Sequence, residues 1–135
     1  MTLDILVVDE LLVGKCIARI LNNQGYYADF YETPAQVAQV FPQKEYDLLI
    51  IEPFEYQSSR GLSQRKDYAQ FIRNFKGKVY LTTTQLEEWI QKDFGLEIGQ
   101  DYSRFYGKPY NTIQLTNDIA IDFNHPQNFL NLNRR

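Results

Sequence analysis

Several side chains that can carry charge or offer a hydroxyl stand directly after apolar runs in the sequence. Asp9 and Glu10 follow "ILVV", Glu52 follows "LLII", Thr83 lies near the end of "KVYLTTT", and Lys108 follows "RFYG". If these runs are parallel strands, their carboxyl ends meet at one edge of the sheet, where ligand sites form. Three carboxylates gathered there repel one another, so we expect one to have a raised pKa unless a cation compensates. Lys108 is the obvious cation, and the set therefore predicts a direct ion pair between Glu52 and Lys108.

Each of these residues also has an ordinary structural explanation. Glu52 fits a solvated acid at a strand end, and Lys108 fits a surface charge. Asp9 and Glu10 fit acids at a helix N-terminus, where the helix dipole favours negative charge. Thr83 fits a β-favoured residue at the end of a strand. A shared site is favoured because all of these residues occur together, each at the end of a predicted strand.

The elements that would position these side chains alternate between strand and helix. The segments 5–8 and 48–51 are apolar at every position, which is typical of strands buried on both faces of a parallel sheet. The predicted strands lie at 5–8, 26–31, 46–54, 78–84 and 104–110.

Between the strands, apolar residues recur at helical spacing, and we expect these sides of the helices to face the sheet. They are Leu12, Cys16, Ile17, Ile20 and Leu21, then Val37, Val40 and Phe41, then Tyr68, Phe71, Ile72 and Phe75, and finally Leu115, Ile119 and Phe123. A short helix is also predicted at 86–94. Helix ends are indicated by Gly25 as a stop, Thr33 as a cap before Pro34, and Asn111 as a cap. Helices alternating with strands across short connections predict an α/β sandwich with helices on both faces of a parallel sheet.

Length and composition limit the classes of protein that fit. A chain of 135 residues fits one domain, which we place at 1–124, followed by a polar tail at 125–135. The net charge of −3 and the lack of a basic block argue against direct nucleic-acid binding. No apolar run is long enough to cross a bilayer. The single cysteine excludes an internal disulfide and fits the reducing cytoplasm.

Taken in order, the strand-end motifs resemble those of receiver domains of two-component response regulators, over residues 3–123. The family's acidic pair after the first strand matches Asp9 and Glu10 in "VVDE", and its "DLxxxD" segment matches "DLLIIE", which ends at Glu52. The resemblance implies a flavodoxin-like (βα)5 fold with strand order 2-1-3-4-5. The segments 55–67 and 95–103 are longer than the corresponding connections of a minimal receiver domain.

The second half of the chain carries the remaining motifs of the resemblance. The family's Thr or Ser after the fourth strand matches Thr83, or Thr82 if the strand is shifted by one residue. The family's Lys-Pro pair matches Lys108 and Pro109, with an aromatic residue three positions earlier at Phe105. The resemblance implies that the lysine contacts a phosphoryl group, while the hydroxyl and the aromatic side chain act as switch residues.

Glu52 stands where the family carries the aspartate that receives a phosphoryl group from a histidine kinase. The resemblance implies that Mg²⁺ assists this transfer, and it makes Asp9, Glu10 and Glu52 the metal-site positions. A glutamate is one methylene longer than an aspartate, and misplacing the oxygen by about 1 Å costs on the order of 100-fold in rate. The longer acids also crowd an octahedral Mg²⁺ that keeps several waters. We therefore expect no cofactor and an unoccupied metal site.

We expect an atypical receiver domain, or pseudo-receiver, which is not an enzyme. It would act in the cytoplasm as a phosphorylation-independent protein-interaction module in bacterial signalling or transcriptional control. Its partner would be a signalling protein, either a histidine kinase or an effector, with a homodimer as a further option and no contact with membrane. The alternative is a receiver domain that a histidine kinase still phosphorylates in a two-component phosphorelay. A flavodoxin-like enzyme or small-ligand binder is disfavoured, because "DELLVGK" has a single Gly where a phosphate-binding loop needs several.

Overall fold

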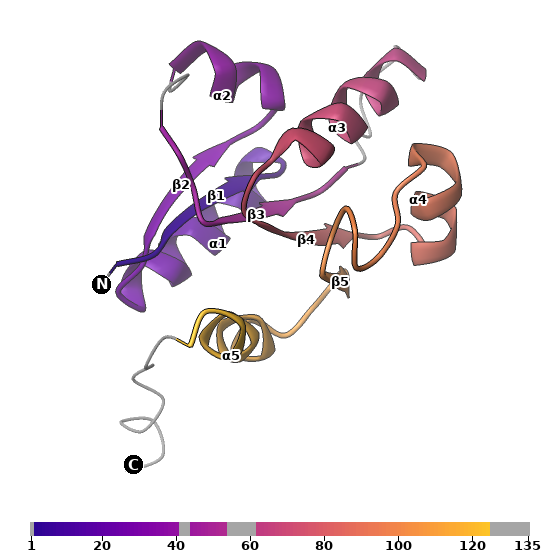
Figure 1. Ribbon diagram of the computed structural model, residues 1–135. Helices are drawn as coiled ribbons and strands as arrows, with labels where there is room; N and C mark the ends of the chain where they lie inside the picture. Colours follow the sequence, from indigo (N-terminus) through magenta and orange to yellow (C-terminus); the bar gives the residue numbers. More distant parts are fainter. Residues whose placement is uncertain (1, 41–43, 54–61, 125–135) are drawn as a thin grey trace.

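The computed structural model of the chain describes residues 2–40, 44–53 and 62–124. Within them, five strands form one parallel sheet in the order β2-β1-β3-β4-β5 (Figure 1). The strands are β1 (Asp4–Val8), β2 (Tyr27–Tyr31), β3 (Leu48–Ile51), β4 (Lys78–Thr83) and β5 (Arg104–Gly107). The helices are α1 (Leu11–Asn23), α2 (Pro34–Val40), α3 (Leu62–Asn74), α4 (Glu87–Phe94) and α5 (Thr112–Asp122). The predicted flavodoxin-like fold and its strand order are confirmed.

The two fully apolar strands lie in the middle of the sheet, as predicted. β1 pairs with β2 on one side and β3 on the other, and β3 in turn pairs with β4. Ile5 to Val8 are at most 1% exposed, and the four residues of β3 are at most 2% exposed. Because both faces are covered, none of the positions 5–8 in β1 or 48–51 in β3 faces water.

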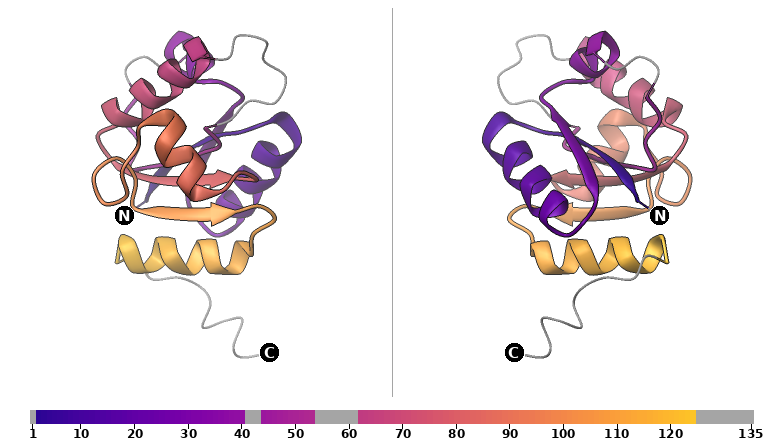
Figure 2. Two further views of the ribbon diagram at one scale, coloured as in Figure 1. Left: turned by 90° about the vertical axis from the view of Figure 1, so that its right-hand side faces the viewer. Right: turned by 90° about the vertical axis from the view of Figure 1, so that its left-hand side faces the viewer.

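Helices cover the two faces of the sheet (Figure 2). On one face, α1 and α5 bring Ile17 and Leu115 into the core that contains Val7. On the other face, α2, α3 and α4 bring residues such as Ile72 into the core that contains Leu49. Figure 2 shows α5, in yellow, across the sheet from α3 and α4. None of the helices in the described ranges could span a lipid bilayer.

The predicted inward side of α1 is wrong in part. Leu12 is 76% exposed and Cys16 is also exposed. The residues that α1 buries are Gly14, Ile17, Ala18 and Leu21. A Cβ atom at Gly14 would lie 2.0 Å from the ring of Phe30, so this glycine allows the helix to approach β2 closely. Glycine has no apolar side chain, so the spacing of apolar residues does not indicate that Gly14 is a core position. For this reason the pattern wrongly predicted that Leu12 and Cys16 face the sheet.

The predicted loop at 55–67 is also wrong in part, because α3 begins at Leu62. Arg65, near the start of this helix, contacts α4. The guanidinium of Arg65 lies 5.5 Å from the ring centre of Trp89 and 3.7 Å from the carboxylate of Asp93. Residues 54–61 lie outside the described residues.

The predicted helix caps are confirmed. Thr33 Oγ1 accepts a hydrogen bond from the backbone N–H of Gln36 at 3.3 Å. Asn111 Oδ1 accepts one from the backbone N–H of Ile113 at 2.8 Å. Gly25 follows α1 with φ of +96°, a conformation that favours glycine. Phe41, the side chain of Val40 and the tail at 125–135 lie outside the described part of the chain.

Candidate functional site

Lys108 contacts two buried carboxylates at the carboxyl end of the sheet. Its Nζ lies 2.9 Å from Asp9 Oδ1, 2.7 Å from Asp9 Oδ2 and 3.1 Å from Glu52 Oε1. Asp9 follows β1, Glu52 follows β3 and Lys108 follows β5, so the lysine connects residues from across the sheet. The predicted ion pair between Glu52 and Lys108 is present, and the shorter contacts are those with Asp9. We refer to Asp9, Lys108 and Glu52 as the strand-end cluster.

The backbone of each residue in the strand-end cluster is fixed by the neighbouring strand. The backbone N–H of Glu52 donates to the carbonyl of Val8 at 2.9 Å, and that of Lys108 donates to the carbonyl of Thr83 at 2.8 Å. The N–H of Asp9 donates to the carbonyl of Tyr31 at 3.2 Å. The three residues therefore continue the hydrogen bonding of the sheet by one position, and their side chains start from fixed points.

Burial governs the electrostatics of the strand-end cluster. The side chains of Asp9, Glu52 and Lys108 are 3%, 5% and 13% exposed. Burial raises the pKa of both carboxyls above their ordinary values, and the nearby ammonium opposes this shift only in part. Burial alone would lower the pKa of Lys108, but its contacts with Asp9 and Glu52 outweigh burial and raise it. The cluster thus contains a charged lysine and two acids that are harder to ionise than in water.

Thr83 is the hydroxyl that reaches the cluster. Burial raises the pKa of Glu52, and a hydrogen bond from Thr83 is the largest effect opposing it. Thr83 Oγ1 also accepts a hydrogen bond from the backbone N–H of Gln85 at 3.1 Å. The hydroxyl of Thr82 is buried and has no hydrogen-bond partner among the described residues. Phe105 is half-buried and packs on the core that α2, α3 and α4 cover.

Glu10 lies outside the strand-end cluster. It precedes α1 in an extended conformation, its side chain makes no capping hydrogen bond, and it is exposed. Consecutive residues of an extended chain point to opposite sides, so Asp9 and Glu10 face different surroundings.

The residues present do not fit the Mg²⁺ site that the resemblance implies for Asp9, Glu10 and Glu52. In the described part of the chain, no three His, Cys, Asp or Glu residues are grouped so that they could hold a metal ion. The ammonium of Lys108 already contacts Asp9 and Glu52, so a metal ion would compete with it for the same oxygens. No chemistry that depends on a metal ion follows from this arrangement.

Tyr110 belongs to the surroundings of the cluster, although the sequence patterns did not single it out. Its hydroxyl is buried without a hydrogen-bond partner among the described residues. Burial raises the pKa of Tyr110, and the negative charges of Asp9 and Glu52 raise it further. Its ring packs 5.6 Å from that of Tyr106, centre to centre. The only signal in the sequence was an aromatic residue two positions after Lys108.

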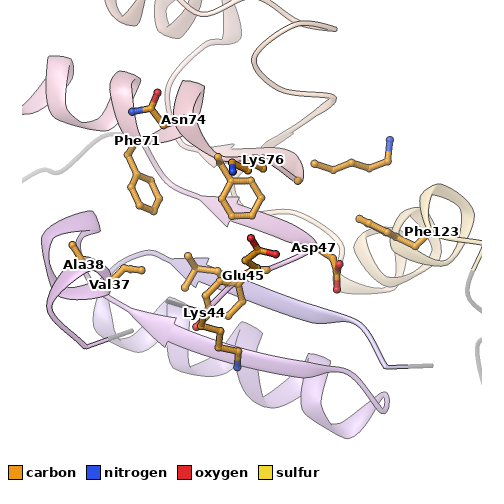
Figure 3. A pocket seen from close by; sticks show the side chains of 14 residues that line it. Val37, Ala38, Lys44, Glu45, Asp47, Phe71, Asn74, Lys76 and Phe123 are labelled. Carbon is orange, nitrogen blue, oxygen red and sulfur yellow. The ribbon is translucent and has the colours of Figure 1, made fainter. Parts of the chain in front are cut away.

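A separate groove lies toward the amino ends of the strands, on the α2 and α3 side (Figure 3). It encloses about 860 Å³. Its lining includes Val37 and Ala38 of α2, Phe71 of α3, and Phe123 after α5. None of the residues predicted to do chemistry lines this groove, so it is separate from the strand-end cluster.

No family model matches the sequence of the chain, and no curated protein matches it. Comparison of structures finds receiver domains. A response regulator receiver protein from Burkholderia phymatum matches with a TM-score of 0.69 at 18% identity, over 94% of this chain and 99% of that one. A two-component response regulator from Clostridium difficile matches with a TM-score of 0.67 at 16% identity, over 90% of this chain and 94% of that one.

A third similar structure was solved with a metal ion. It is the receiver domain of a sensor histidine kinase from Pseudomonas aeruginosa, with magnesium coordinated in its active site cleft. It matches with a TM-score of 0.63 at 14% identity, over 89% of this chain and 96% of that one. At these levels of identity the matches establish the fold: the chain has the fold of a response-regulator receiver domain.

Proposed function

We propose that the chain is an atypical receiver domain, or pseudo-receiver, that acts in bacterial signalling as a protein-interaction module without being phosphorylated. The observation that carries the proposal is the position of Lys108 Nζ, 3.1 Å from Glu52 and within 2.9 Å of both carboxylate oxygens of Asp9. The resemblance assigns this lysine to the phosphoryl group of a phosphorylated domain. Here the longer acid Glu52 takes that contact. The module turns over no substrate, and its partner is a signalling protein such as a histidine kinase or an effector.

Glu52 replaces the phosphoryl group through two contacts. Its carboxylate contacts the lysine, and it receives a hydrogen bond from Thr83, the residue that the resemblance makes the hydroxyl switch. Phe105, the matching aromatic residue, is half-buried against the core. We infer that the domain has one resting state, which corresponds to the phosphorylated state of an ordinary receiver domain.

Phosphoryl transfer to Glu52 is disfavoured by the same contacts. A nucleophilic carboxylate must be ionised and free to approach the donor, whereas burial raises the pKa of Glu52. The incoming group also needs a cation, and the ammonium of Lys108 is engaged by Asp9 through its two shortest contacts. An added phosphoryl group would have to displace these contacts before it could bind.

Incubation with radiolabelled acetyl phosphate and Mg²⁺ tests the proposal. We expect no incorporation into the wild-type protein above that of Glu52→Gln, beside an ordinary receiver domain as the positive control. Stable, Mg²⁺-dependent incorporation that is lost in Glu52→Gln would instead support the alternative, a receiver domain that a histidine kinase phosphorylates. The variant Glu52→Asp tests whether the length of the acid prevents phosphoryl incorporation. The aspartate side chain is one methylene shorter and ends farther from Lys108.

A further inference from the structure

A second set of polar contacts positions α4, and it does not involve the strand-end cluster. Tyr102 is 2% exposed, and its hydroxyl lies against α4 from within the protein. The hydroxyl donates a hydrogen bond to Glu87 Oε2 at 2.6 Å and accepts one from Gln91 Nε2 at 2.8 Å. Glu87 and Gln91 lie one helical turn apart, so a single hydroxyl contacts two successive turns of α4.

The segment that carries Tyr102 is itself ordered by local hydrogen bonds. The α4–β5 connection, residues 95–103, buries Leu96 to 1% exposure in the core. The backbone N–H of Asp101 donates to the carbonyl of Glu97 at 2.8 Å, and its side chain accepts from the N–H of Glu97 at 2.9 Å. The N–H of Ser103 donates to the carbonyl of Val79 at 2.8 Å, which fixes the end of the connection to β4. The connection is therefore a folded part of the domain.

Arg73 of α3 connects the same segment to the third helix. Its Nη2 donates to the carbonyl of Phe94 at 3.3 Å and to the carbonyl of Gly95, the two carbonyls at the C-terminus of α4. Its Nε lies 3.9 Å from a carboxylate oxygen of Asp101. Gly95 ends α4 with φ of +66°, which turns the chain into the connection. The C-terminal end of α4 is thus fixed from α3, while Tyr102 contacts Glu87 and Gln91 in the N-terminal part of the helix.

We propose that the α4–β5 connection is a latch that holds α4 in one position on the sheet, whatever the state of the strand-end cluster. The inference deepens the proposed function and rests on it, because a domain with one resting state presents a fixed surface, and contacts that hold α4 add to those of Glu52. The partly buried hydrogen bonds between Tyr102 and α4 provide such contacts, at a distance in sequence from Asp9 and Glu52. The latch makes the α4 surface a permanent feature of the domain.

Amide hydrogen exchange of the full chain tests the latch. Tyr102→Phe removes one hydroxyl and keeps the ring in the core. We expect the amides of α4 to exchange about tenfold faster in this variant, because a hydrogen bond to a charged group is lost from a local structure. The amides of β1 and β3 should keep their wild-type rates. Gln91→Ala, which removes the second hydrogen bond from the α4 side, should accelerate the same amides.

Two further variants decide what causes the effect. Tyr106→Phe is the matched control, because the Tyr106 hydroxyl donates to Asp118 of α5 at 2.7 Å; it should accelerate α5 and leave α4 unchanged. In Lys108→Ala, the amide exchange rates of α4 and of β3 should change by the same factor. The proposal of a latch is refuted if the α4 amides keep their wild-type exchange rates in Tyr102→Phe. It is also refuted if Lys108→Ala accelerates exchange in α4 but not in β3. The proposed function is refuted by a different measurement, the incorporation of a phosphoryl group. That result would not change the effect of Tyr102→Phe on amide exchange in α4, so the two failures can be told apart.

Discussion

Replacing Lys108 by alanine removes the cation from a cluster that is almost closed to solvent. The ammonium contacts Asp9 and Glu52, whose side chains are 3% and 5% exposed. Water cannot readily replace the lost charge, so the 0–1 kcal/mol typical of exposed ion pairs does not apply. Removing one partner of a buried pair costs about 3–5 kcal/mol when the other charge stays ionised. The two acids can lower this cost by taking up a proton.

Proton uptake sets the size of the loss and its dependence on pH. The ordinary pKa of Glu52 is 4.5. Each pH unit above this pKa adds about 1.36 kcal/mol to the cost of neutralising the acid. Neutralisation therefore costs about 3.4 kcal/mol at pH 7, which is about 2.5 units above the pKa, and about 0.7 kcal/mol at pH 5. We therefore expect Lys108→Ala to lower the free energy of unfolding by about 3 kcal/mol at pH 7 and by about 1 kcal/mol at pH 5.

The sign of the pH dependence follows from the direction of the shifts. The pKa values of Asp9 and Glu52 are raised in the folded protein, above 3.8 and 4.5 respectively. An acid of this kind favours folding most at pH below its ordinary pKa, and the contribution is lost as pH rises through the folded pKa. Without Lys108 the folded pKa values rise further, so the deficit of the variant widens between pH 5 and pH 7.

Urea unfolding at the two pH values measures this difference. Lys44→Ala is the matched control, because Lys44 pairs with Asp29 at 2.8 Å but is 34% exposed. We expect that control to lose about 0–1 kcal/mol, as exposed pairs do. If Lys108→Ala behaves like Lys44→Ala and shows no recovery at pH 5, the strand-end cluster is not an electrostatic unit and the reasoning fails.

Three other changes have defined outcomes in the same unfolding assay. Glu52→Gln should stay within about 1 kcal/mol of wild type at pH 7, because it removes one of two buried acids while Lys108 keeps the other; a loss of about 3 kcal/mol would mean that the ionised form of Glu52 is essential for folding. Tyr110→Phe should raise the free energy of unfolding by about 1 kcal/mol, because a buried hydroxyl without a partner is removed; a loss of similar size would reveal a hydrogen bond. Gly77→Ala should cost more than about 1 kcal/mol, because the new Cβ would lie 2.3 Å from the carbonyl oxygen of Asp47; tolerance of alanine would show that this backbone contact can relax.

Much of the fold could be predicted because its strands are unambiguous. The apolar runs at 5–8 and 48–51 leave no solvent-facing side, which requires central strands of a parallel sheet. The strand ends then bring Glu52 and Lys108 to one edge of the sheet, and their ion pair follows from that geometry. The phase of α1 could not be predicted from apolar residues, because a core position of that helix is Gly14, where the ring of Phe30 fills the space of a side chain.

The details of the strand-end cluster depend on the directions in which side chains point, and composition does not specify these directions. Asp9 and Glu10 are adjacent acids in the sequence, yet one is buried against Lys108 and the other is exposed. The alternation of side chains in extended structure was the signal that could have separated them. Tyr102 gave no signal, because its role depends on how residues 95–103 fold back on α4. Such a contact is set by packing between distant segments and not by a local pattern.

The most direct test of the central claim is an NMR titration with beryllofluoride and Mg²⁺, a mimic of the phosphoryl group. The backbone amides of Thr83 and Lys108 report on the strand-end cluster, since Lys108 N donates to the carbonyl of Thr83. If Glu52 already takes the place of the phosphoryl group, both amide signals should keep their positions through the titration. Saturable, Mg²⁺-dependent shifts of both signals, absent in Glu52→Gln, would contradict the account and show that the domain still binds a phosphoryl group.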